Sequence, residues 1–257
     1  MNDLDTLPGK AQKQLFVIPI IDRSGSMSAH GNIGKVNDAM KEVAPQLVEI
    51  EQSNNVSIRL APISFASGAS WLGLNSEGQP VGPSDFKWTD MIASGGTDLG
   101  AAFKLLNSKL TRTENGGWLE GRKGLRPVIL LISDGEPNDD WENPLKDLSK
   151  RGWFKVASKF AIAVEGADLS VLERFTGNKE AIYNTDTLRT DLGTLVKAIV
   201  LAASMAVSDA GGAPMDTASV DNNNITDANE AEQQNILNTV NETLGVNDNN
   251  QFFDENN

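Results

Sequence analysis

Three short polar segments of this sequence carry oxygen-rich side chains that could together bind a hard metal ion. Oxygen ligands without nitrogen or sulfur donors suit Mg²⁺, Mn²⁺ or Ca²⁺. We predict one divalent cation, with Mg²⁺ preferred over Mn²⁺ and Ca²⁺. The candidate ligands are the carboxylates of Asp22 and Asp134 and the hydroxyls of Ser24, Ser26 and Thr97.

Each segment, taken alone, also has an ordinary structural interpretation. Asp134-Gly135 is typical of a tight turn, because glycine tolerates a positive φ. Thr97 after two glycines is typical of a helix cap, and the segment from Asp22 to Ser26 is typical of a polar loop. The combination favours a metal site because each segment lies beside a predicted strand end or helix start.

The elements expected around these segments alternate between strands and helices. Buried strands are predicted at residues 15–21, 127–132, 160–164 and 181–183, with an alternating strand at 56–65 and an edge strand or hairpin and a loop at 66–90. Helices are predicted at residues 36–50, 98–110, 144–150, 169–175 and 188–205. This order indicates an α/β fold: a doubly wound, mostly parallel sheet with helices on both faces. Such sheets bind ligands at the carboxyl ends of their strands.

Two prolines are unusual for central strands. Pro19 lies in the first predicted strand and Pro62 in its neighbour, and each removes a backbone donor from the hydrogen-bond ladder. We expect a paired bulge to accommodate both residues.

The order of the three segments resembles the metal-ion-dependent adhesion site (MIDAS) of von Willebrand factor A (VWA) domains. The motif Asp-x-Ser-x-Ser at residues 22–26 is followed by Thr97 and then by Asp134, over a resemblance of roughly residues 15–204. It implies that the three hydroxyls bind the cation directly or through water, and that the two carboxylates bind largely through water. It also implies an open position that a partner protein's Asp or Glu fills.

A narrower resemblance is to the bacterial tellurium-resistance-associated TerY-like proteins. It is carried by the Asp22 to Met27 motif, by Gly95-Gly96-Thr97, and by Asp134-Gly135-Glu136-Pro137 with the nearby residues Asp139, Asp140 and Trp141. This resemblance implies a stress or defence pathway with kinase-like or phosphatase-like partners.

Composition excludes several classes of function. Cysteine is absent, which rules out disulfides and thiolate chemistry. The net charge is -13, so a nucleic-acid partner is not expected. The sequence lacks an apolar run of membrane-spanning length, and residues 1–14 do not read as a secretory signal. We therefore predict a cytoplasmic protein without a membrane partner.

The predicted organisation is an N-terminal tail at residues 1–14, a VWA domain at 15–205 and an acidic tail at 206–257. The acidic tail is expected to be mostly disordered, because its composition buries little apolar surface. A short helix at 227–244 is the exception, either as a partner-binding helix or as a marginal helix without a partner. As a further hypothesis, an acidic residue of this tail fills the metal site as an internal competitor.

Two classes of function follow from these observations. The first is a non-enzymatic adaptor that binds a protein partner through the cation. The alternative is a metal-dependent phosphohydrolase, in which an Asp at a strand end works with bound Mg²⁺. The alternative is weaker, because Arg23-Ser24 stands where a second Asp is expected and the motifs place no Lys to steady a transferring phosphate.

Overall fold

A seven-stranded, mostly parallel sheet forms the centre of the protein, with the strand order β4-β3-β1-β5-β6-β7 and with β2 also paired to β1. The computed structural model describes residues 13–111, 116–118, 125–134, 136–164, 167–188, 190–209 and 222–246. The strands are β1 (Lys13–Asp22), β2 (Val56–Leu60), β3 (Ile63–Ala66), β4 (Gly68–Trp71), β5 (Val128–Ser133), β6 (Ser158–Ala163) and β7 (Ile182–Asn184). Only β4 is antiparallel to its neighbour.

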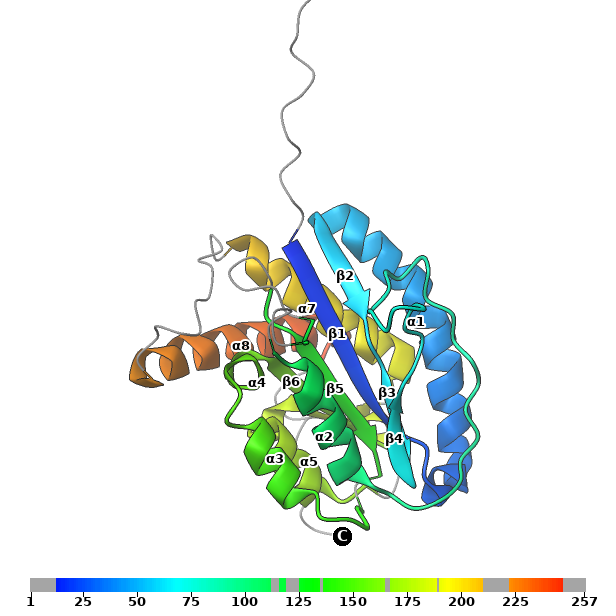
Figure 1. The fold of residues 1–257 in the computed structure, drawn as a ribbon. Coiled ribbons are helices and arrows are strands. Elements are labelled where there is room, and N and C mark those ends of the chain that lie inside the picture. The colour runs from blue at the N-terminus through cyan, green and yellow to red at the C-terminus, as the bar shows by residue number, and fades with distance from the viewer. Residues whose placement is uncertain are drawn as a thin grey trace, which may run out of the picture.

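Helices cover both faces of the sheet (Figure 1), which confirms the predicted doubly wound α/β architecture. One face packs against α1 (Asn32–Asn54), α7 (Leu192–Asp209) and α8 (Asn222–Leu244). The other packs against α2 (Leu99–Lys109), α3 (Glu142–Leu148), α4 (Gly152–Val156) and α5 (Leu169–Thr176). Short helical turns complete the described elements: η1 (Gly25–Gly31), η3 (Lys179–Ala181) and α6 (Thr185–Leu188).

The two prolines stand opposite each other, and the structure does not contain the expected bulge between them. The strand predicted at 56–65 is divided into β2 and β3, which both pair with the same edge of β1. The register is identical on either side of the break, since Val17 pairs with Leu60 and Ile20 with Ile63. Pro19 therefore faces Pro62, and the two missing donors interrupt the ladder at one level without shifting it.

The helix predicted at 188–205 is also divided in two. Asp191 lies between α6 and α7, directly before the first residue of α7. Its carboxylate accepts hydrogen bonds from the backbone N and the hydroxyl of Thr194 (2.9 and 2.7 Å). A side chain that satisfies the free amides of a first helical turn favours a helix start at that point. α7 consequently begins at Leu192.

Helix α8 packs against the domain, which differs from both expectations for the helix at 227–244. The domain itself covers the apolar face of α8, because Ile236, Leu237 and Val240 are buried in the same core as α1 and α7. The hydroxyl of Tyr183 on β7 also donates to the Asn241 side chain (3.2 Å). Tertiary packing thus stabilises a helix that would be marginal in isolation. None of the helices in the described ranges is both long and apolar enough to cross a membrane.

Candidate metal site

The carboxyl ends of β1 and β5 bring two of the predicted ligands together. Asp22 is the last residue of β1, and Asp134 directly follows the end of β5. The two strands are neighbours in register, with Ile21 opposite Ile132, so both chains leave the sheet at the same level. Asp22 is fully buried and Asp134 nearly so.

Both carboxylate oxygens of Asp22 accept short hydrogen bonds. Its Oδ1 accepts from the backbone N of Ser24 (2.7 Å), and its Oδ2 accepts from the hydroxyl of Ser133 (2.7 Å). Two residues later the chain brings the Ser24 and Ser26 hydroxyl oxygens to 2.9 Å from each other. This turn therefore brings two of the predicted hydroxyl ligands together and holds the Asp22 carboxylate in place by hydrogen bonds.

Electrostatics at Asp22 favour a nearby positive charge. Burial raises the pKa of the Asp22 carboxyl, hydrogen bonds from Ser133 and Ser24 oppose this rise, and the charge of Asp134 adds to it. The net direction is upward, so the surrounding protein does not compensate the cost of holding this carboxylate ionised. A divalent cation is a charge that would offset both desolvation and repulsion.

Asp134 has a buried oxygen that no described residue satisfies. Its Oδ1 is removed from solvent and has no hydrogen-bond partner, although buried carboxylate oxygens are nearly always paired. Such an orphaned acceptor beside Asp22 and the neighbouring hydroxyls of Ser24 and Ser26 is what a bound cation, or its water shell, would satisfy. These residues therefore fit a hard divalent cation.

Thr97 reaches this edge on a loop that is bonded to the first segment. The backbone N of Gly25 donates to the Gly95 carbonyl (3.1 Å), and the backbone N of Ser94 donates to the Arg23 carbonyl (2.8 Å). Gly95 has a positive φ of 83°, and a Cβ at this residue would lie 2.8 Å from the Ser67 hydroxyl. Glycine is therefore required where this loop passes Ser67, between β3 and β4.

The alternative interpretation of Thr97 as a helix cap does not agree with the geometry. Asp98 holds the N-cap position of α2, and its side chain accepts from the Gly68 backbone N instead (2.7 Å). The first amides of α2 donate to Asp139, from Gly100 to Oδ1 (2.9 Å) and from Ala101 to Oδ2 (3.1 Å). Thr97 is buried just ahead of the helix and is not needed for capping.

Two residues that position the predicted ligands were not predicted from the sequence. Asn138 forms a reciprocal pair with Thr97, since its side-chain oxygen accepts from the Thr97 N and its own N donates to the Thr97 carbonyl (both 2.9 Å). Ser133 holds Asp22. The parallel register could have identified Ser133, because the residue after Ile132 must face the residue after Ile21. No sequence signal singles out Asn138.

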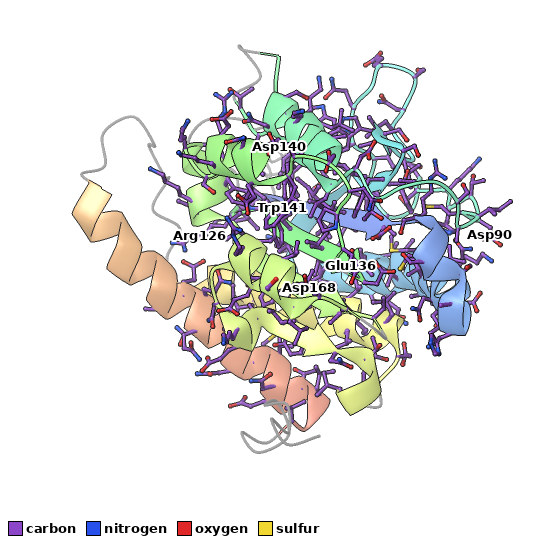
Figure 2. All side chains as sticks on the ribbon, turned by 90° about the horizontal axis from the view of Figure 1, so that it is seen from below. Asp90, Arg126, Glu136, Asp140, Trp141 and Asp168 are labelled. Atoms are coloured by element: carbon purple, nitrogen blue, oxygen red, sulfur yellow. The ribbon has the colours of Figure 1, made fainter. Side chains whose placement is uncertain are left out.

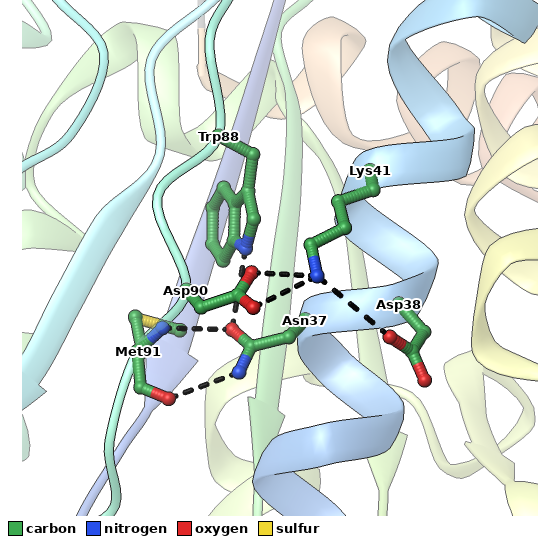
Figure 3. Close-up of polar contacts among 6 residues, drawn as sticks. All are labelled: Asn37, Asp38, Lys41, Trp88, Asp90 and Met91. Carbon is green, nitrogen blue, oxygen red and sulfur yellow. Dashed lines mark hydrogen bonds and ion pairs between the residues drawn. The ribbon is translucent and has the colours of Figure 1, made fainter.

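The loop before Thr97 is also tied to α1 (Figure 3). The side chain of Asn37 accepts from the backbone N of Met91 (2.9 Å) and donates to the Met91 carbonyl (2.9 Å), and it accepts from the Trp88 indole (3.2 Å). Lys41, one turn later, pairs with Asp90 (2.8 Å). We call residues 88–97 the strap, because they connect α1 to the metal loop.

Other acidic residues lie around the same edge (Figure 2). Glu136 and Asp168 lie near the middle of this view, Asp140 and Trp141 lie on the side of α2 and α3, and Asp90 lies near α1. Within the described ranges, however, no group of three or more Asp, Glu, His or Cys side chains could hold a metal ion. Besides Asp22 and Asp134, a cation here would therefore depend on hydroxyls, water and any carboxylate supplied by a partner.

Solved structures with the same fold include proteins of several sources. Proximal thread matrix protein 1 from the mussel byssus has a TM-score of 0.54 and 18% identity, over 75% of this chain and 48% of that chain. In another structure of the mussel protein, zinc occupies a MIDAS motif. A von Willebrand factor type A protein from Catenulispora acidiphila has a TM-score of 0.52 and 15% identity, over 75% of this chain and 43% of that chain.

The pilus adhesin SpaC from Lactobacillus rhamnosus GG, in its open conformation, has a TM-score of 0.52 and 13% identity, over 77% of this chain and 30% of that chain. At such identities these likenesses show the fold alone, and this chain spans less than half the length of each of these proteins. No curated protein sequence matches the chain. The family model for the von Willebrand factor type A domain matches residues 17–198. Because this match covers well over half of the sequence, the chain belongs to the von Willebrand factor type A domain family.

Proposed function

We propose that this VWA domain binds one divalent cation, Mg²⁺ in preference to Mn²⁺ or Ca²⁺, and uses it to bind a protein partner. The ligands are Asp22, Ser24, Ser26, Thr97 and Asp134, directly or through water. The observation that carries the proposal is the buried Asp134 Oδ1, which has no hydrogen-bond partner among the described residues and lies beside a second buried carboxylate. The zinc-occupied MIDAS motif of the mussel protein supports a metal at such a site in this fold.

The partner supplies an Asp or Glu carboxylate to the cation. Asp22 and Asp134 would bind the ion largely through water, and both oxygens of Asp22 already accept hydrogen bonds. The ion would then have few direct anionic ligands from this chain. An incoming carboxylate would therefore gain a strong electrostatic contact with the metal. A cation thus allows an acidic protein to recognise an acidic side chain.

Catalysis is not part of this proposal. A phosphohydrolase that uses an Asp nucleophile needs one carboxylate oxygen free to attack phosphorus. In this chain the Ser24 amide and the Ser133 hydroxyl each donate to one oxygen of Asp22, and such donors make a carboxylate less nucleophilic. The phosphohydrolase alternative therefore has less support than the adaptor.

The finer parts of the proposal rest on the resemblance to TerY-like proteins. They are a role in a tellurium-resistance-like stress or defence system and kinase-like or phosphatase-like partners. A cytoplasmic location likewise stays a prediction.

Isothermal titration of Mg²⁺ and Mn²⁺ into chelator-treated protein tests the metal site. We expect saturable one-site binding that is lost in the Asp22→Ala, Ser24→Ala double variant. Ser64→Ala is a matched control, because Ser64 is a buried strand serine whose described side-chain contact is to Ser70. Wild-type protein that binds neither cation would contradict the proposal.

Partner binding needs a separate measurement. Proteins retained by the immobilised chain are compared with Mg²⁺, with chelator, and with the double variant in Mg²⁺. A partner of the proposed kind is retained only by the wild type with Mg²⁺, and acid-to-amide substitution in that partner abolishes its retention. Retention that is unchanged by chelator would exclude binding through the cation.

A further inference from the structure

We propose that Arg23 and Ile92 form a second part of the partner-binding surface, beside the cation, and select a partner segment with two acidic residues and an apolar residue. One carboxylate of that segment binds the cation, and the second binds the Arg23 guanidinium. The proposal rests on the proposed function, because the cation must bind the first carboxylate. It goes further in that it names the chemistry by which the domain distinguishes one acidic partner from another.

The backbone of Arg23 is fixed between two neighbouring segments. Its N donates to the Phe65 carbonyl on β3 (2.9 Å), and its carbonyl accepts from the Ser94 N of the strap (2.8 Å). Arg23 stands between the predicted ligands Asp22 and Ser24, so its Cα lies about 3.8 Å from the Cα of each. The Arg23 side chain therefore starts directly beside the predicted ligands.

The guanidinium of Arg23 is held at the surface without an acidic partner. Its Nη1 donates to the Ser94 hydroxyl (3.2 Å) in a solvent-exposed contact. No carboxylate of the described residues forms an ion pair with Arg23, although the protein has a net charge of -13. A guanidinium has further N–H donors in a planar fork that matches the two oxygens of a carboxylate. Arg23 can therefore receive an acidic side chain.

The opposite side of the metal site carries negative charge. Glu136 is exposed two residues beyond Asp134, and the backbone N of Asp168 donates to the Asp134 carbonyl (2.7 Å). The carboxylates of Glu136 and Asp168 thus lie on the β5 and β6 side of the site (Figure 2). Like charges repel, so a partner's second carboxylate is disfavoured there.

The strap side has no such repulsion next to Arg23. The strap contains one acidic residue, Asp90, and its carboxylate pairs with Lys41 on α1 (2.8 Å). The charge of Asp90 is thus offset within the protein, whereas the charge of Arg23 is not. A segment with two acidic residues would therefore bind with one on the cation and the other over Arg23.

Ile92 presents an apolar side chain on the same side of the site. Its side chain is 80% exposed, and among the described residues the other exposed large hydrophobic residue is Met205. One exposed isoleucine is ordinary by itself. Ile92, however, stands two residues before Ser94, on a strap that three hydrogen bonds fasten to Asn37. A side chain that is already held in place loses little freedom when a partner covers it, which favours binding.

Selection from a phage-displayed peptide library tests the proposal. The library carries one fixed Asp between randomised residues, and the full chain selects from it in saturating Mg²⁺ or in chelator. We expect the peptides that bind only with Mg²⁺ to be enriched in a second Asp or Glu and in apolar residues. The preference for a second acid should disappear in Arg23→Gln, and the preference for apolar residues should disappear in Ile92→Thr.

A peptide from this selection gives the size of the effect. At saturating Mg²⁺, Arg23→Gln should bind it about two- to tenfold more weakly than wild type does. Replacement of the peptide's second acid by its amide should weaken binding to wild type by a similar factor and leave binding to Arg23→Gln unchanged. Arg151→Gln is the matched control and should bind as wild type, because Arg151 lies between α3 and α4 and bonds to Asn107 (2.6 Å).

The outcomes separate this inference from the proposed function. Peptides that need Mg²⁺ but show no preference for a second acid would overturn the inference and leave the proposed function intact. A library without any Mg²⁺-dependent peptide would contradict both proposals. If Arg23→Gln weakened binding of the acidic peptide and of its amide form equally, Arg23 would act on the shape of the site rather than on the second carboxylate, and the inference would fail.

Discussion

The hydroxyl of Ser133 donates a hydrogen bond of 2.7 Å to Asp22, although 111 residues separate the two in sequence. The contact joins β1 to β5 at the level where both strands end. It holds one oxygen of a buried carboxylate that the proposed cation would also attract, so Ser133 orients a ligand without itself being one of the predicted ligands.

Removal of this hydroxyl should weaken metal binding. In Ser133→Ala, Asp22 loses the donor that orients it, and residues in such supporting positions change metal affinity by about 10- to 100-fold. Isothermal titration of Mn²⁺ measures the change. Ser64→Ala, at a buried serine of β3, should retain wild-type affinity. Equal affinity in both variants would mean that Ser133 does not support the site.

Gly100 should tolerate no side chain. A Cβ at this residue would lie 2.2 Å from the Asp140 carbonyl oxygen, in the loop that holds Thr97 through Asn138. Gly100→Ala is expected to lower the free energy of unfolding by about 1–3 kcal/mol, because the backbone of this loop must shift. Chemical denaturation provides the measurement.

Gly34 provides the control for this substitution. It lies within α1, and a Cβ there meets nothing within 4 Å. Gly34→Ala should stabilise the protein by about 0.5–1 kcal/mol through helix propensity. Destabilisation by both substitutions to the same extent would show that the contact with Asp140 is unimportant.

The strap should loosen when Asn37 is removed. Asn37→Ala deletes three hydrogen bonds to Met91 and Trp88, two of which satisfy backbone groups. Leaving buried polar groups unpaired costs about 1–3 kcal/mol each, less where water can enter. Hydrogen exchange of the Met91 amide should therefore accelerate.

Lys41→Ala is the neighbouring control, because it removes only exposed ion pairs, those with Asp90 and Asp38. Such pairs contribute little to stability. Exchange at Met91 should stay close to wild type in this variant. Faster exchange of the Met91 amide in Lys41→Ala but not in Asn37→Ala would show that Lys41, and not Asn37, holds the strap against α1.

The ion pair that fastens α8 should give a pH dependence of stability. Burial raises the pKa of Glu232 despite the opposing charge of Arg126, and burial lowers the pKa of Arg126 despite Glu232. The distance of 2.7 Å shows a close pair, but the cost of desolvation exceeds its attraction. A raised carboxyl pKa in the folded state means that stability is lost as pH rises through the window above the ordinary value of 4.5.

Thermal unfolding of wild type and Glu232→Gln across this window checks the prediction. Relative to the variant, the wild type should lose stability as the pH is raised from about 4.5 toward neutrality. Glu242→Gln, at an exposed position of the same helix, should follow the wild type. Parallel curves for wild type and Glu232→Gln would show that the Glu232 carboxyl is not destabilised by burial.

Local patterns in the sequence were sufficient to predict the alternation of strands and helices, the parallel sheet and the chemical type of the candidate ligands. Buried strands such as β5 are continuous apolar runs, and α1 shows its apolar face at helical spacing, so both signals are contained in adjacent residues. Parallel strands also bring their carboxyl ends to one edge, which is why Asp22 and Asp134 could be expected to lie close together.

The tertiary structure alone decided which side chains support those ligands and where the last helix lies. Ser133 reaches Asp22, Asn138 pairs with Thr97, and Pro19 faces Pro62 because of strand register and loop packing between distant segments. The apolar face of α8 is too small to stabilise an isolated helix, and the helix packs instead on the surface formed by α7 and β7. Periodicity reports which face of a helix is buried, but the surface that buries it is formed by residues far away in the chain.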